Sequence, residues 1–387
     1  MKTINQVLSL LIVSLFLFNC ENSSSSNDVK EEQVEEIDLK DQVELLSKLY
    51  TPDNLPEQSF KVKPNKDTSL VGENGTVIQI FKNSFVDENG EIITEAVEVT
   101  LKEALDPLSI VNAGLTTTSN GQKLQTGGMI YLNAKSGNKT VSIAENSPLG
   151  VMIPNDDINL EMKIFKGEQT EKGMNWVAPE SLLNEDIEKL KKIKNESKPK
   201  QEEEKVEGNS IDAIFGFVDS TEAGGFVKEV PRPEDVPQFG RFTKYVEQKG
   251  TNYFSVDHKT SYIFEMKDLG WANIDRLFSD PRTQLVELLT EIKNASEFDK
   301  VYITMVISEM YLPGYQMKNG DFSFTHGDTE KPKLPVGEKA VIFATAYKNN
   351  KPHFDILTTQ IKEKETITLN LAETTEDELR TKLKGNL

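Results

Sequence analysis

Between residues 60 and 371, apolar and polar side chains alternate in short runs. A period of two residues is the pattern of a β-strand that buries one face. Turn sequences rich in Asn and Gly separate the runs, and strands recurring about every 8–12 residues are typical of a sandwich or barrel. The pattern therefore predicts a mainly β protein. The clearest turn sequences are Glu73-Asn74-Gly75, Asp87-Glu88-Asn89-Gly90, Asn120-Gly121 and Ser136-Gly137-Asn138.

Two regions carry this alternation, and we expect each to form a β-sandwich. In the first, residues 56–180, the apolar residues Val97, Val99 and Leu101 alternate with polar ones. In the second, residues 255–372, the segment 283–294 suits either a helix or a strand, and its β-rich flanks favour a strand. The other strands expected in this second region are residues 261–266, 301–307, 340–347, 353–360 and 366–371.

Helical periodicity lies outside the two sandwiches. Leu39, Val43 and Leu46 follow the spacing of an amphipathic helix, which predicts a short helical segment within residues 37–55. Residues 373–387 form the second predicted helix, with Thr375 as N-cap and acidic residues in the first turn. Residues 181–210 read as a charged linker and residues 211–254 as an irregular connector. The predicted architecture is two β-sandwich domains with short flanking helices.

Composition narrows the classes of partner. With 63 acidic against 44 basic side chains, the formal net charge is −19. A protein that neutralises phosphates needs Lys and Arg in excess, so we expect no nucleic-acid partner. One cysteine in 387 residues excludes an intramolecular disulfide.

The first 19 residues have the form of a signal peptide. Lys2 is their only charge, and residues 7–18 are apolar apart from two serines. Twelve residues are too few for a membrane span, which needs about 20, but they match a secretory signal. The run ends in Leu17-Phe18-Asn19-Cys20 and resembles the lipobox of a bacterial lipoprotein, in which an invariant Cys receives the lipid. Asn19 departs from the usual small residue, a departure similar to signals seen in Bacteroidota.

We expect Cys20 to be the lipidation site and the membrane contact. Residues 20–36 are Ser-rich and acidic, a composition typical of a disordered tether. A processed chain would be a lipid-anchored protein of the outer membrane, on either the cell surface or the periplasmic face. The alternative is an ordinary cysteine near the cleavage site of a soluble secreted protein.

Two stretches of the chain carry a family resemblance. The first comprises residues 71–78, Phe85, 114–117 and 124–129, and the second comprises residues 269–276 and 334–337. The first resembles a β-module of Bacteroidota surface lipoproteins of unassigned role and, more distantly, the ZU5 module of adaptor proteins, whereas the second is similar to the C-terminal part of those lipoproteins. The resemblance implies architecture and location but no activity. Self-cleaving ZU5 relatives cut before Ser in a His-Phe-Ser step, and here His353-Phe354 is followed by Asp355.

The sequence contains no recognisable catalytic motif. It lacks the Gly-x-Ser-x-Gly elbow, the phosphate-binding loop and the dinucleotide fingerprint. The three histidines, His258, His326 and His353, form no metal-binding pattern, so we expect no metal ligands and no catalytic residues. Ca²⁺ stays an alternative cofactor, because residues 87–90 and 155–157 offer oxygen ligands. Turn formation by Asn and Gly explains the first of these runs without a metal.

The most distinctive local feature is residues 271–276. Trp271 with Asn273, Asp275 and Arg276 would give an aromatic platform beside an amide, a carboxylate and a guanidinium, which suits a sugar or peptide ligand. In the structural alternative, Trp271 is a core anchor at a strand end and Asp275 pairs locally with Arg276.

These observations favour a lipid-anchored cell-envelope protein that acts as a non-catalytic binding or structural module for protein or glycan partners. One alternative is a surface hydrolase for glycans or peptides that uses dispersed carboxylates. A second alternative is an accessory subunit of a secretion or gliding apparatus.

Overall fold

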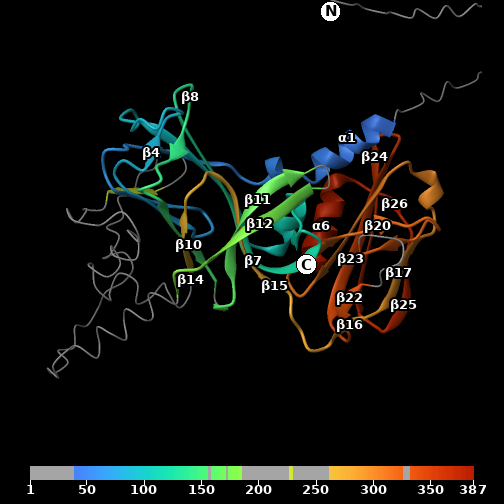
Figure 1. The fold of residues 1–387 in the computed structure, drawn as a ribbon. Coiled ribbons are helices and arrows are strands. Elements are labelled where there is room, and N and C mark those ends of the chain that lie inside the picture. Colours follow the sequence, from blue (N-terminus) through green and yellow to red (C-terminus); the bar gives the residue numbers. More distant parts are fainter. Residues whose placement is uncertain (1–38, 156–157, 171–172, 185–225, 230–260, 326–331) are drawn as a thin grey trace, which may run out of the picture. The chain divides into compact units, whose positions relative to one another are not determined.

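The computed structural model describes residues 39–155, 158–170, 173–184, 226–229, 261–325 and 332–387. The predicted signal peptide and tether lie outside the described residues, as do most of the predicted linker and connector and two histidines, His258 and His326. The described chain is mainly β, which confirms the predicted class, and its strands form the two sandwiches described below (Figure 1).

The first sandwich packs two sheets around one apolar core. Sheet A contains β1 (Gln58–Val62), β5 (Val97–Ala104), β7 (Gln122–Ser136), β15 (Gly270–Leu277), β11 (Lys163–Thr170) and β12 (Gly173–Ser181) in that spatial order, with β6 (Thr118–Ser119) and β8 (Lys139–Thr140) paired to β7. Sheet B has the order β13 (Phe226–Glu229), β2 (Thr68–Val71), β3 (Val77–Ile80), β10 (Leu149–Pro154) and β14 (Ser261–Met266). A small pair, β4 (Phe85–Val86) and β9 (Ser142–Ile143), stands apart. Val99 and Leu132 of sheet A meet Ile78 and Val151 of sheet B in a fully buried core.

Two strands of this sandwich come from the range predicted for the second one. β14 pairs with β10, and β15 lies between β7 and β11 at the centre of sheet A. The predicted domain boundary at residue 255 is therefore wrong for these strands. Alternation identifies a strand with a buried face, but it does not say which sheet the strand joins, because pairing depends on residues far away in the sequence.

The predicted linker also begins too early. Ser181 ends β12, and the next residues run along the edge of β14. There Leu183 N–H donates to the Ile263 carbonyl at 2.7 Å, and the buried Asn184 amide bonds both the Ser261 carbonyl and the Ile263 N–H. An edge strand exposes unpaired backbone groups, and Asn184 satisfies some of those on β14.

The second sandwich is built from sheets C and D. Sheet C has the order β20 (Tyr315–Gln316), β21 (Phe322–Ser323), β17 (Glu287–Ile292) and β25 (Lys364–Leu369), with β17 and β25 parallel. Sheet D has the order β19 (Met310–Pro313), β18 (Val301–Ile307), β23 (Lys339–Lys348), β24 (Lys351–Gln360) and β26 (Ala372–Glu373). β16 (Thr283–Leu285) and β22 (Lys333–Pro335) form a separate pair, and η3 (Ala295–Glu297) is a short 3₁₀ turn. The strand interpretation of residues 283–294 is thus confirmed.

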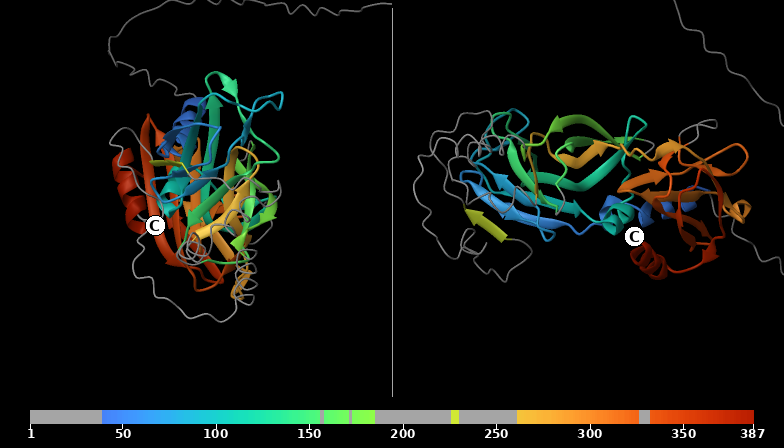
Figure 2. Two further views of the ribbon diagram at one scale, coloured as in Figure 1. Left: turned by 90° about the vertical axis from the view of Figure 1, so that its left-hand side faces the viewer. Right: turned by 90° about the horizontal axis from the view of Figure 1, so that it is seen from below.

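A third apolar cluster joins the two sandwiches, and the described residues from 39 onward belong to one compact unit. It gathers α1 (Leu39–Leu49), α2 (Pro107–Asn112) and α6 (Glu376–Asn386) with strands of sheets A and D. The η1 turn (Pro52–Asn54) follows α1, and between them Tyr50 Oη shares a hydrogen bond of 2.8 Å with Thr345 Oγ1. Thr117 N–H donates to the Tyr311 carbonyl at 3.1 Å, so backbone bonds also cross between the sandwiches. Figure 2 gives two further views of α6 beside the strands of the second sandwich.

The predicted N-cap of the last helix is confirmed. Thr375 Oγ1 accepts from Glu378 N–H at 3.2 Å, and Glu378 Oε2 accepts from Thr375 N–H at 3.2 Å, which completes a capping box. Replacing Thr375 with Ala should lower the free energy of unfolding by about 1 kcal/mol, read from the urea midpoint. Thr381→Ala, on an exposed position of the same helix, is the matched control. Equal midpoints for the two variants would contradict a stabilising cap.

Candidate functional site

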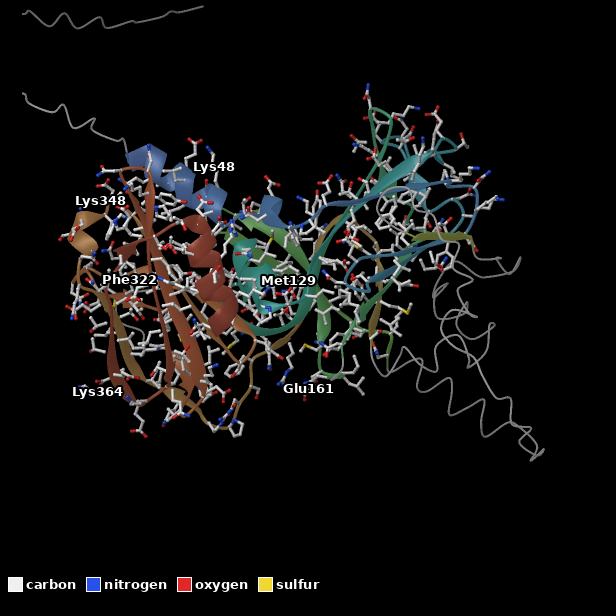
Figure 3. The ribbon with its side chains drawn as sticks, turned by 180° about the vertical axis from the view of Figure 1, so that it is seen from behind. Lys48, Met129, Glu161, Phe322, Lys348 and Lys364 are labelled. Carbon is white, nitrogen blue, oxygen red and sulfur yellow. The ribbon has the colours of Figure 1, made fainter. Side chains whose placement is uncertain are left out.

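The predicted ligand residues all lie on β15, but they differ in the face of the sheet that they occupy and in their burial. Trp271, Asn273 and Asp275 share one face of sheet A, whereas Arg276 lies on the opposite face and pairs with Glu161 at 3.1 Å. Figure 3 labels Glu161. Trp271 is half-buried, and Asn273 and Asp275 are both 0% exposed. Of these three side chains, only Trp271 is therefore partly accessible to a ligand.

Asn273 and Asp275 belong to a buried hydrogen-bonded group. Thr126 Oγ1 donates to Asn273 Oδ1 at 2.8 Å, and Asn273 Nδ2 donates to Asp275 Oδ2 at 2.7 Å. Burial raises the pKa of Asp275 well above its ordinary value, and it outweighs the hydrogen bonds with Thr126 and Asn273, which lower that pKa. The predicted local pairing of Asp275 with Arg276 is replaced by the bond from Asn273.

A β-bulge in β7 places Thr126 in this group. Between the pairs Met129–Asn273 and Thr126–Asp275, β7 has the two residues Gly127 and Gly128 where β15 has only Ile274. Gly128 has a φ of 125°, and a Cβ on Gly127 would lie 2.7 Å from the ring of Tyr262. The Gly-Gly pair is thus required for the turn of the backbone and for close packing.

Trp271 belongs to a cross-strand row on this face, formed by Lys102, Tyr131, Trp271 and Gly167 on β5, β7, β15 and β11, in which Lys102 is buried. Register pairs Lys102 with Tyr131 and Tyr131 with Trp271, and the two aromatic rings lie 5.3 Å apart at 47°. A Cβ on Gly167 would come 2.6 Å from the Cβ of Trp271, so only glycine leaves room for the indole beside it. Tyr131 and Trp271 are both half-buried.

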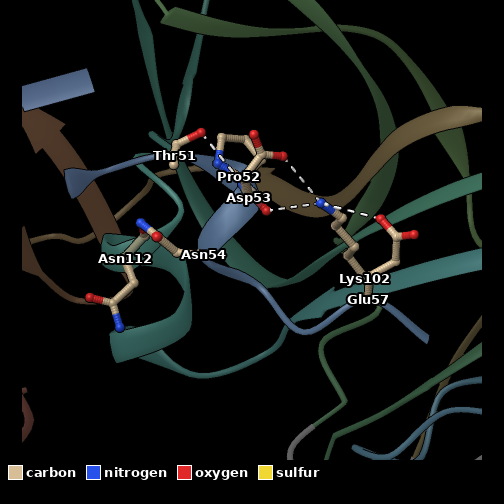
Figure 4. Close-up of polar contacts among 7 residues, drawn as sticks. All are labelled: Thr51, Pro52, Asp53, Asn54, Glu57, Lys102 and Asn112. Atoms are coloured by element: carbon tan, nitrogen blue, oxygen red, sulfur yellow. Dashed lines mark hydrogen bonds and ion pairs between the residues drawn. The ribbon is translucent and has the colours of Figure 1, made fainter. Parts of the chain in front are cut away.

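Lys102 closes one end of the row. Its ammonium donates to the Pro52 carbonyl at 3.3 Å and lies 3.4 Å from a carboxylate oxygen of Asp53 and 3.7 Å from one of Glu57 (Figure 4). The η1 turn is held in turn by Asn54, which donates to the Leu49 and Asn112 carbonyls. The lysine therefore ties the segment after α1 to sheet A rather than presenting a charge of its own.

Polar side chains flank the row on the same face. Asn133 is exposed on β7 and pairs in register with Thr100 of β5, which pairs with Ser59 of β1. The sequence signal for this surface was the alternation of Tyr131 and Asn133 with Ile130 and Leu132. That signal shows a solvent face but not its alignment with Trp271, which lies 140 residues further along the chain.

Metal candidates are few among the described residues. No group of three or more His, Cys, Asp and Glu side chains there is placed to hold an ion. Asp87 Oδ1 accepts from the N–H groups of Asn89 and Glu91 at 2.9 and 3.0 Å, which supports the turn explanation for that run. Residues 156 and 157, from the second predicted run, lie outside the described residues, and His353 Nδ1 contacts the Lys351 carbonyl.

The chain matches no known protein family model, and no curated protein matches it significantly. In the part of the chain that the structure describes, no helix is both long and apolar enough to cross a membrane.

Proposed function

We propose that this is a lipid-anchored protein of the bacterial outer membrane whose folded part is a non-catalytic binding module for a protein or glycan partner. The observation that carries the proposal is the pair of partly exposed aromatic rings, Tyr131 and Trp271, on the face of sheet A opposite the core of the first sandwich, where Trp271 also packs against the cluster between the sandwiches. Aromatic rings with one accessible side contribute large contact energies at recognition sites. The amide of Asn133 and the hydroxyl groups of Thr100 and Ser59 lie on the same face and are groups that hydrogen-bond ligands.

The arrangement of the N-terminal segment supports anchoring through Cys20. The residues between Cys20 and the start of α1 are polar, and a coil of about 18 residues has a typical reach of roughly 20–25 Å. The chain then enters the folded unit at α1, whose Leu46 and Leu49 are buried in the cluster between the sandwiches. An anchor at Cys20 would therefore hold both sandwiches near the membrane through one fixed element.

Anchoring predicts a specific labelling result. In cells given an alkyne analogue of palmitate, the protein should incorporate the label and sediment with membranes, whereas Cys20→Ala should do neither. Asn19→Ser, which restores a small residue before the cysteine, is the matched control and should stay labelled. Equal labelling of Cys20→Ala and the unaltered chain would contradict the anchor.

The binding role is tested on cells with Asn133→Cys. Lipidation consumes the thiol of the chain's only natural cysteine, so the new thiol is the one that a maleimide dye can reach. A partner over the cross-strand row should slow labelling of this thiol on cells relative to the purified protein. A cysteine at the exposed Leu285 is the control, because it lies on β16 and should react at the same rate in both settings. Equal rates at residue 133 would remove the case for a binding module.

A further inference from the structure

Resting on that binding role, we infer that the cross-strand row binds an uncharged glycan, with a pyranose ring stacked on Trp271 and Tyr131. A pyranose presents C–H groups on its faces and hydroxyl groups around its rim. The C–H groups pack against an aromatic ring, and the hydroxyl groups form hydrogen bonds with neighbouring amides and hydroxyls. The row has both features, since Asn133, Thr100 and Ser59 lie beside the aromatic pair on the same face.

The charges on this face favour a neutral ligand. Around the row and its polar flank, three lysines are matched by three carboxylates, although the whole chain has a net charge of −19; Lys163 is a further exposed lysine of this face, opposite Asp275. Lys135 lies 3.4 Å from Glu98, which also pairs in register with Lys61. The third lysine is Lys102, and the other two carboxylates are Asp53 and Glu57, both of which pair with Lys102. An anionic or cationic polymer would have to disrupt these pairs, whereas a neutral one would not.

The surface suits a glycan better than a protein. Protein interfaces bury a central apolar patch, with a polar rim around it. On this face of the described sheet, Tyr131 and Trp271 are the partly exposed aromatic side chains; polar residues lie beside Tyr131, and Trp271 packs against the edge of the cluster between the sandwiches. A narrow aromatic strip with polar flanks matches a single sugar chain lying across the strands.

The two tryptophans of the chain allow a direct test. Trp176 is 0% exposed and donates its indole N–H to the Thr116 carbonyl, whereas Trp271 is half-buried. Acrylamide should therefore quench mainly Trp271 in the mature full-length protein in detergent. The probes are hexasaccharides of β-1,4-linked glucose, mannose and N-acetylglucosamine, with a hexamer of galacturonic acid as the anionic comparison. At least one neutral probe should protect Trp271 from acrylamide by about twofold or more.

Variants then assign the contact. Trp271→Ala and Tyr131→Ala should each weaken binding of that probe about tenfold by calorimetry, which corresponds to about 1.4 kcal/mol. Trp271→Phe and Tyr131→Phe should retain most of the affinity. Asn133→Ala, at an exposed position, should weaken binding without altering the fold, and Leu285→Ala should leave binding unchanged.

Two results would overturn the inference. One is the absence of protection by all three neutral probes, and the other is tighter binding of the galacturonic acid hexamer. The thiol-masking experiment separates this failure from that of the binding role. Slow labelling of Asn133→Cys on cells, without glycan protection, would leave the module with a protein partner. Equal labelling rates on cells and in the purified protein, together with no glycan protection, would reject both the glycan inference and the binding role.

Discussion

Replacing Glu103 with Ala should lower the free energy of unfolding by about 3–5 kcal/mol, because three hydrogen-bond donors would lose their acceptor, at about 1–3 kcal/mol for each donor left buried. Glu103 is 2% exposed and lies on β5, with its side chain directed into the first sandwich. Its carboxylate accepts from Gln58 Nε2 at 2.8 Å and from the backbone N–H groups of Asn74 and Thr76 at 3.0 and 3.1 Å. One side chain of sheet A thereby holds the turn between β2 and β3 of sheet B.

The fit around this carboxylate explains why small changes should matter. A Cβ on Gly72 would lie 2.6 Å from Glu103 Oε2, so the turn closes directly on the acid. Glu103→Gln should also destabilise the protein, because its amide nitrogen would face hydrogen-bond donors. Gly72→Ala should destabilise the unaltered protein more than it destabilises Glu103→Ala, where the clashing carboxylate is gone.

Urea unfolding at neutral pH measures these effects, since the midpoint reports stability when the slope is unchanged. Glu98→Ala is the matched control. Glu98 lies on the same strand but faces out, and its surface pair with Lys135 should contribute less than about 1 kcal/mol. A Glu103→Ala midpoint as close to the unaltered protein as that of Glu98→Ala would show that the carboxylate does not support the turn.

Local signals located the elements of this fold well. The predicted strand at residues 301–307 coincides with β18, and the predicted helix after Thr375 begins at Glu376. Both depend on residues within one or two turns of the backbone. Sheet membership does not, and β14 and β15 were placed with the wrong sandwich because their partners are more than 100 residues away.

The predicted ligand residues show a related effect. The sequence of residues 271–276 suits either a ligand platform or a core anchor with local pairing, and it does not decide between the two. In sheet A, Asn273 pairs with Phe165 and Met129, which belong to the cluster between the sandwiches. Alternation distinguishes the two faces of a strand, but it does not show whether other parts of the protein cover the second face. Tyr131 was missed as a partner of Trp271 because the two meet only through strand pairing.

Asp275→Asn should make the protein more stable at neutral and alkaline pH, with an effect that grows as the pH rises. Asp275 is 0% exposed, and its Oδ1 has no hydrogen-bond partner among the described residues. Ionising the carboxylate there would create a buried charge whose cost of burial outweighs its hydrogen bonds with Thr126 and Asn273. Asparagine keeps the size and one acceptor oxygen while removing the charge.

The sign of the pH dependence follows from the raised pKa of Asp275. In the unfolded chain an Asp loses its proton near pH 4, but in the folded protein this one retains it to higher pH. The folded state then binds more protons than the unfolded state, so stability falls as the pH rises between the two pKa values, by up to about 1.4 kcal/mol per pH unit. The stabilising contribution of the protonated acid is fully present below the unfolded value.

Urea midpoints of the unaltered protein and Asp275→Asn, measured from pH 4 to pH 9, test this dependence. Other carboxylates titrate in both proteins, so the difference between their midpoints isolates Asp275. The difference should be smallest at pH 4 and increase in favour of Asp275→Asn with rising pH, until the folded carboxyl ionises. Asp268→Asn, at an exposed position paired with Lys166 at 3.0 Å, should show a small difference with little pH dependence. A constant difference for Asp275→Asn across this range would mean that the buried acid is ionised throughout, and its environment would then have to supply a compensating charge.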